Sequence, residues 1–130
     1  MWYTIHVATQ LCTTQPQEVE PTMYEPKVHS EQTELLMQAV LQLRTTEDAY
    51  RFFEDLCTIA EMKSMAQRME VAALLRRKET YQEIAGRTGA STATISRVNR
   101  ALTYGADGYN RVLDSLERAA LSAPDTGAEA

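Results

Sequence analysis

Residues 81–100 read YQEIAGRTGASTATISRVNR, and they are the most informative part of the sequence about its fold. A helix-turn-helix needs two short helices joined by a tight turn, and each part of that motif has its residue here. Ala85 is small where the two helices would touch, and Gly89 stands where the chain must leave the first helix with a positive φ. The positions that must pack inward are all apolar: Ile84, Ile95 and Val98. The pattern predicts a helix-turn-helix.

The outer face of the second helix carries small polar and basic side chains. Serine and threonine hydroxyls can bond several base edges in the major groove, and an alanine can touch a thymine methyl group. The candidate DNA-binding residues on this helix are Ser91, Thr92, Ala93, Ser96, Arg97 and Arg100. At the start of the first helix, Gln82 is placed to reach the DNA backbone or an adenine edge. Basic residues flank the motif as expected phosphate contacts: Arg76, Arg77, Lys78 and Arg87.

The charge distribution agrees with one phosphate-facing surface. The net charge is −5, which alone argues against DNA binding. Residues 76–111, however, carry 7 Lys/Arg against 3 Asp/Glu, whereas residues 1–75 carry 5 against 11. An acidic body with one basic segment is typical of a protein with a single phosphate-facing surface. Charge alone does not distinguish such a surface from a solvated helix face.

The helix expected at residues 33–43 is apolar on nearly every side. Its Leu36, Val40 and Leu43 cannot all face the core of one subunit. A helix of this kind must be covered all round, and in a domain this small a second subunit is the favoured cover. This stretch predicts a homodimer.

Further helices are expected over 47–56, 59–77 and 109–121. Thr45 offers an N-cap for the first of these, and Thr58 with Glu61 has capping-box spacing at the start of the second. Thr80 and Glu83 repeat that spacing ahead of the helix-turn-helix. The inward positions expected on the long helix are Ile59, Met62, Met65, Ala66, Met69, Ala73 and Leu74, and those on the last helix are Val112, Leu113, Leu116 and Leu121. Six helices and no convincing strand predict an all-α domain.

The domain is expected to span residues 30–121. Prolines interrupt residues 1–29, which indicates a weakly ordered arm, and the composition of 122–130 indicates a disordered tail. Met23 opens a natural start for the domain, so we expect the first 22 residues to be a dispensable extension or a product of start-codon choice.

Other classes of protein find no support in the sequence. No stretch approaches the roughly 18–20 consecutive apolar residues of a membrane span, and no secretory signal opens the chain. Cys12 and Cys57 are far apart, so reduced thiols in a cytoplasmic protein are expected, with no metal and no cofactor. His6 lies in the arm and His29 is isolated, and no nucleophile–base cluster indicates an enzyme.

The run from Tyr50 to Tyr109, densest in TYQEIAGRTGASTATISRV, resembles the Trp-repressor superfamily, specifically its YerC/YecD-type branch. The resemblance covers about residues 30–118. It implies a six-helix domain that forms an intertwined homodimer, in which the N-terminal helices of two chains interleave. That implication agrees with the all-round apolar helix at residues 33–43.

One departure from the family pattern concerns its ligand. In the Trp repressor a glycine follows the arginine beside which the indole ring of tryptophan lies. Arg97 matches that arginine, but Val98 follows it and should occupy the space of the ring. The second arginine that sandwiches the ring would fall near Gln67 or Arg68. The resemblance therefore carries no tryptophan site over to this chain.

The leading hypothesis is a sequence-specific transcriptional regulator that binds double-stranded DNA as a homodimer. A repressor is favoured over an activator, because nothing in the sequence resembles an activation domain. Two alternatives stay open. One is a corepressor-gated regulator that binds a small molecule other than tryptophan between the long helix and the recognition helix. The other is a protein-interaction module with a helix-turn-helix fold.

Overall fold

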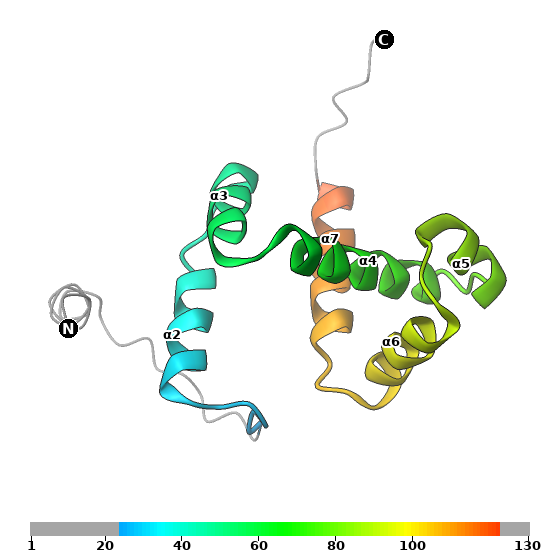
Figure 1. Cartoon of the computed structure of the whole chain (residues 1–130), viewed down its shortest axis with the longest axis horizontal. Helices are drawn as coiled ribbons and strands as arrows, with labels where there is room; N and C mark the ends of the chain where they lie inside the picture. The colour runs from blue at the N-terminus through cyan, green and yellow to red at the C-terminus, as the bar shows by residue number, and fades with distance from the viewer. Residues whose placement is uncertain (1–23, 123–130) are drawn as a thin grey trace, which may run out of the picture. The chain divides into compact units, whose positions relative to one another are not determined.

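A computed structural model describes residues 24–122, which form six helices and no strand (Figure 1). The helices are α2 (Glu31–Val40), α3 (Thr46–Leu56), α4 (Ile59–Arg76), α5 (Tyr81–Thr88), α6 (Thr92–Tyr104) and α7 (Gly108–Ser122). The all-α prediction is confirmed. The chain divides into two compact units, with the boundary between Arg44 and Thr45. The expectations for residues 1–23 and 123–130 lie outside the described residues.

The first unit contains α2, in which Leu35 and Met37 are exposed while Leu36 and Val40 are half-buried. Ser30 caps the helix, because its hydroxyl accepts the N–H of Thr33 at 3.1 Å. The helix ends at Val40, before the expected end at residue 43, because the N–H groups of residues 42 and 43 bond to carbonyls three residues back and tighten the chain. No residue of α2 is buried, and Leu35 and Leu41 are 57% and 79% exposed.

The second unit starts its helices with the residues that the sequence indicates. Four N-caps each accept, through the side-chain hydroxyl, the N–H of the residue three positions on: Thr45, Thr58, Thr80 and Ser91. Two of them form complete capping boxes, in which Glu61 and Glu83 bond back to the cap N–H. Each such cap stabilises its helix by about 1 kcal/mol, so the helix starts are fixed locally.

The core of the second unit lies where α4, α5 and α6 meet, and α7 adds one residue to it. Figure 1 shows α5 and then α6 beside the C-terminal end of α4. The inward positions predicted in the helix-turn-helix are confirmed, since Ile84 and Ile95 are fully buried and Val98 nearly so. The remaining core residues are Val71, Ala72, Leu74, Ala90 and Leu113. Each large side chain buried here contributes about 1.5–3 kcal/mol.

The predicted inward stripes of the two longer helices were partly wrong. On α4, Ile59 is 77% exposed, and the core instead uses Val71 and Ala72 from the other end of the helix. On α7 only Leu113 is buried, whereas Leu116 and its expected partners Val112 and Leu121 are exposed. Helical periodicity identifies an apolar face but not the partner that covers it.

The C-terminal end of α6 is set at Gly105, whose backbone is extended (φ −83°, ψ −158°). Its N–H makes the last helical bond, to the Ala101 carbonyl at 2.9 Å, and a Cβ at this position would collide with that same carbonyl. The helices of residues 24–122 are all too short or too polar to cross a membrane.

Candidate nucleic-acid interface

The turn between α5 and α6 has the conformation that its glycine predicts. Gly89 has φ +72° and ψ 7°, in the left-handed region that L side chains disfavour, and its N–H bonds to the Ala85 carbonyl. The Thr88 hydroxyl donates to the Ile84 carbonyl at 2.7 Å and accepts the N–H of Ala90 at 3.1 Å. One threonine side chain thus links the last turn of α5 to the start of the connection.

The outer face of α6 is a continuous exposed arc. Thr92, Ser96 and Arg100 follow one another every four residues, and because a helix turns about 100° per residue they lie along one line. Ala93 and Arg97 lie beside that line and are also exposed. The opposite face is buried in the core described above. The geometry therefore leaves small hydroxyls near the start of α6 and guanidinium groups further along, as the sequence predicts.

Ser91 has a structural role besides its predicted contact. Its hydroxyl caps α6 by accepting the N–H of Thr94 at 3.2 Å, and it lies 3.0 Å from the Thr94 hydroxyl. A capping hydroxyl has limited freedom to bond a base edge. The residue is exposed, so it still lies at the surface where α6 begins.

The flanking candidates other than Arg76 are exposed: Arg77, Lys78, Gln82 and Arg87. Gln82 lies in the first turn of α5, and Lys78 lies between α4 and α5. Arg87 pairs with Glu79 at 2.9 Å but keeps about half of its side-chain surface exposed (55%). Contact of these side chains with DNA stays a prediction.

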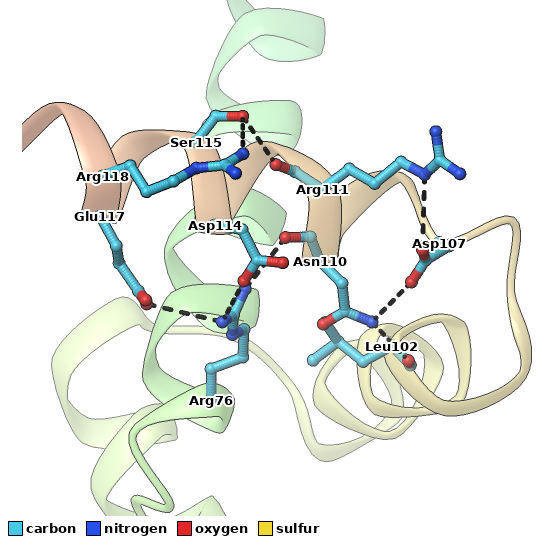
Figure 2. Close-up of polar contacts among 9 residues, drawn as sticks. All are labelled: Arg76, Leu102, Asp107, Asn110, Arg111, Asp114, Ser115, Glu117 and Arg118. Carbon is cyan, nitrogen blue, oxygen red and sulfur yellow. Dashed lines mark hydrogen bonds and ion pairs between the residues drawn. The ribbon is translucent and has the colours of Figure 1, made fainter.

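Arg76 was wrongly expected to contact phosphate. Figure 2 shows its guanidinium group turned toward α7, where it donates to the Asn110 carbonyl at 3.1 Å and to the Asp114 carboxylate at 2.6 Å. Glu117 lies 3.7 Å from the same group. The hydrogen bond to Asp114 raises the pKa of Arg76 above its usual value. Helix α4 therefore uses this arginine to hold α7 rather than to meet a ligand.

Glu83 keeps its charge at the start of α5. Its carboxylate accepts the N–H of Thr80 at 2.9 Å, and that bond holds the pKa of Glu83 below its usual value. A negative charge in the first turn of a helix is favourable because the backbone N–H groups there carry partial positive charge. The capping box thus contributes to fixing α5 in place.

Sequence reasoning missed three polar residues around α6. Asn99 is exposed on the helix itself, next to the predicted arc. Gln67 of α4 donates to the Thr88 carbonyl at 3.1 Å, and Asn110 of α7 donates to the Leu102 carbonyl at 3.0 Å. No local pattern indicates the last two contacts, because each joins a side chain to a distant backbone carbonyl. Asn99 could have been found from its place in the helical repeat.

Known proteins are similar to this chain in sequence and in fold. The profile of the family described as Trp repressor protein matches residues 31–117, which is more than half of the chain. The chain belongs to the Trp repressor family. The Bacillus subtilis (strain 168) protein YerC is 50% identical to it over 91 residues, which make up 70% of this chain and 88% of that protein.

Two solved structures share both sequence and fold with this family member. A TrpR-like protein from Eubacterium eligens is 56% identical with a TM-score of 0.67, over 70% of this chain and 94% of the other. A proposed Trp repressor from Staphylococcus aureus is 42% identical with a TM-score of 0.68, over 74% of this chain and 96% of the other. The six-helix fold and the helix-turn-helix are therefore those of a family of transcription regulators.

Val98 follows Arg97 where the Trp repressor has a glycine, and its side chain is 2% exposed and part of the core of this Trp repressor family member. Gln67, one of the two positions expected for the second arginine, directs its amide to the Thr88 carbonyl. Neither residue presents a side chain that would hold an indole ring. Among residues 24–122, no three His, Cys, Asp or Glu side chains gather where they could hold a metal ion.

Proposed function

We propose that this Trp repressor family member is a sequence-specific DNA-binding protein that represses transcription as a homodimer. The observation that carries the proposal is the exposed arc of α6, backed by a buried face of Ile95 and Val98. A rigid helix with short polar side chains on its free face has the dimensions and the chemistry to enter the major groove.

The residues of the arc divide between base edges and phosphates. Thr92, Ala93 and Ser96 are short and lie near the start of α6, so they reach the base edges. Arg97 and Arg100 are longer and lie further along, so they meet phosphates. The exposed flanking residues assist on the backbone: Lys78, Gln82 and Arg87. Phosphate contacts fix the protein on the duplex, and base contacts choose the sequence.

The homodimer is supported by apolar surface that one chain leaves uncovered. Leu35, Met37 and Leu41 of the first unit are each more than half exposed, and α2 contains no buried residue. Val112 and Leu116 of α7 are similarly exposed. We infer that a second copy covers these side chains, because large exposed apolar surfaces mark protein interfaces. Two copies related by two-fold symmetry would read a pseudo-palindromic site with half-sites about 34 Å apart, near one turn of B-DNA.

A selection experiment tests the proposed function. The purified full chain is mixed with a library of random DNA duplexes, and bound duplexes are recovered and sequenced through several rounds. We expect an inverted repeat to emerge, bound with an affinity that falls steeply as salt concentration rises. Recovered sequences that match the input library, or binding that ignores salt, would contradict the proposal and favour a protein-interaction module.

A further inference from the structure

Helix α6 is held near both ends by side chains from other helices. Near its start, the Gln67 amide of α4 donates to the carbonyl of Thr88, the last residue of α5, at 3.1 Å. Near its end, the Asn110 amide of α7 donates to the carbonyl of Leu102 at 3.0 Å. We call these the front contact and the rear contact. Both use carbonyls from the last turn of a helix, which lack a partner within that helix.

The front contact acts on the turn that sets the course of α6. Thr88 is tied through its carbonyl to Gln67 and through its hydroxyl to both Ile84 and Ala90. Gly89 and Ser91 then complete the entry to α6 with a left-handed turn and an N-cap. A shift of the Thr88 backbone would therefore be passed on to the first turn of α6, where Thr92 lies.

The rear contact is itself anchored to α4. Figure 2 shows Asn110 between two partners, with its amide on the Leu102 carbonyl and its backbone carbonyl on the guanidinium group of Arg76. The amide of Asn110 also lies 3.2 Å from the Asp107 carboxylate, and Arg76 is bonded to Asp114. Polar contacts that surround the apolar core thus connect both ends of α6 to one helix, α4.

We propose that Gln67 and Asn110 are positioning residues, which hold α6 in the orientation that reads DNA without touching DNA themselves. The inference rests on the proposed function. Apolar packing alone permits small sliding and rotation of one helix on another, whereas a hydrogen bond to a defined carbonyl fixes one register. Selective binding requires that register, because base contacts tolerate little displacement. Non-selective attraction to phosphates does not require it.

Shape-conserving variants separate positioning from stability. Gln67→Met keeps the length of the side chain and removes the donor, and Asn110→Leu does the same at the rear contact. Ser115→Ala is the control, since the exposed Ser115 hydroxyl donates to the Arg111 carbonyl within α7, so its loss removes a bond to a backbone carbonyl without changing a contact between helices. Affinities for the selected site and for a scrambled site are measured at several salt concentrations, at a temperature where circular dichroism shows each protein folded.

Each positioning variant is expected to lose about tenfold in affinity for the selected site while keeping its affinity and salt dependence on the scrambled site. Ser115→Ala should match wild type on both. If either positioning variant fails to fold, its milder partner is used: Gln67→Asn, which shortens the side chain by one methylene, or Asn110→Ser. Unchanged selectivity in folded front and rear variants overturns the inference and leaves the proposed function standing. A wild type without selectivity overturns both.

Discussion

The helix-turn-helix and α2 differ in how far one chain covers their apolar side chains. Ile84 and Ile95 of the helix-turn-helix are completely buried within the second unit. In the first unit, Leu35 of α2 is 57% exposed, and Leu41, which follows α2, is 79% exposed. Helix α2 is nevertheless as well capped as any other helix. Local signals in the sequence determine the helices of both regions equally well. Only the helix-turn-helix, however, has buried residues of its own.

This difference indicates which part of the protein needs a partner. The helix-turn-helix can hold its shape within a single chain, because α4 supplies the surface on which it packs. Helix α2 has the sequence of a covered helix but no buried residue of its own. We infer that a second copy completes α2, while the DNA-reading surface is complete in each copy.

The largest effect is expected from charges on α2. Leu36→Asp with Val40→Asp should abolish the folded dimer, because two carboxylates would enter an apolar interface without partners. Sedimentation and circular dichroism at micromolar concentration measure assembly and helix content together. Gln32→Asp with Gln42→Asp adds the same charge at exposed polar positions and should remain dimeric. A wild type that sediments as a well-folded monomer would refute the assignment of α2 to a dimer interface.

The next effect is in the core of the helix-turn-helix. Ile95→Ala should lower the free energy of unfolding by about 2–5 kcal/mol, because the cavity forms in a site closed on all sides. Leu121→Ala on α7 is the matched change at an 87% exposed position and should stay within about 0.5 kcal/mol of wild type. Urea unfolding measures both. Similar losses in the two variants would show that the core is misplaced.

Two glycines of the helix-turn-helix should respond in opposite directions. Gly89→Ala should cost about 1–2 kcal/mol, because φ is +72° there, although a Cβ would meet no atom within 4 Å. Gly86→Ala should stabilise by about 0.5–1 kcal/mol, because Gly86 lies inside α5 with equally open space. Thermal unfolding of both variants tests the pair. A neutral Gly89→Ala would mean that the turn is not left-handed.

The smallest effect concerns Lys78, which has φ +65° at the end of α4. Glycine is the residue favoured at such a position, so Lys78→Gly should stabilise the fold by about 0.5–1 kcal/mol. The same change should weaken binding to every DNA sequence and reduce the salt slope by about 1 per subunit, because a phosphate contact is lost. Unfolding and DNA titration are measured on one sample. A more stable variant with unchanged DNA affinity would remove Lys78 from the interface.

The sequence predicted the fold wherever the determinant is local. Capping residues and Gly89 mark helix starts and a turn through contacts within a few residues, so the helices could be assigned in order. Burial at the outer ends depends on which element packs there, and periodicity does not contain that information. This is why Ile59 and Leu121 were expected inside and are exposed.

The candidate site, like the fold, could be predicted only where residues close in the sequence determine it. The arc of α6 follows from which face is apolar. Arg76 was misassigned because its partners Asp114 and Glu117 are more than 30 residues away in the sequence. The contact between Gln67 and Thr88 was not predicted because its acceptor is a backbone carbonyl, which every residue has.

We propose that α6 reads DNA, with base contacts from its short side chains and phosphate contacts from its arginines. The most direct measurement titrates wild type and two double variants against the selected and the scrambled site at several salt concentrations. Thr92→Ala with Ser96→Ala should change the preferred bases, and each lost base contact should cost about 1–3 kcal/mol per half-site. Arg97→Ala with Arg100→Ala should weaken binding to both sites alike and flatten the salt dependence. A wild type without sequence preference, together with a Thr92/Ser96 variant that binds as wild type does, would contradict the account.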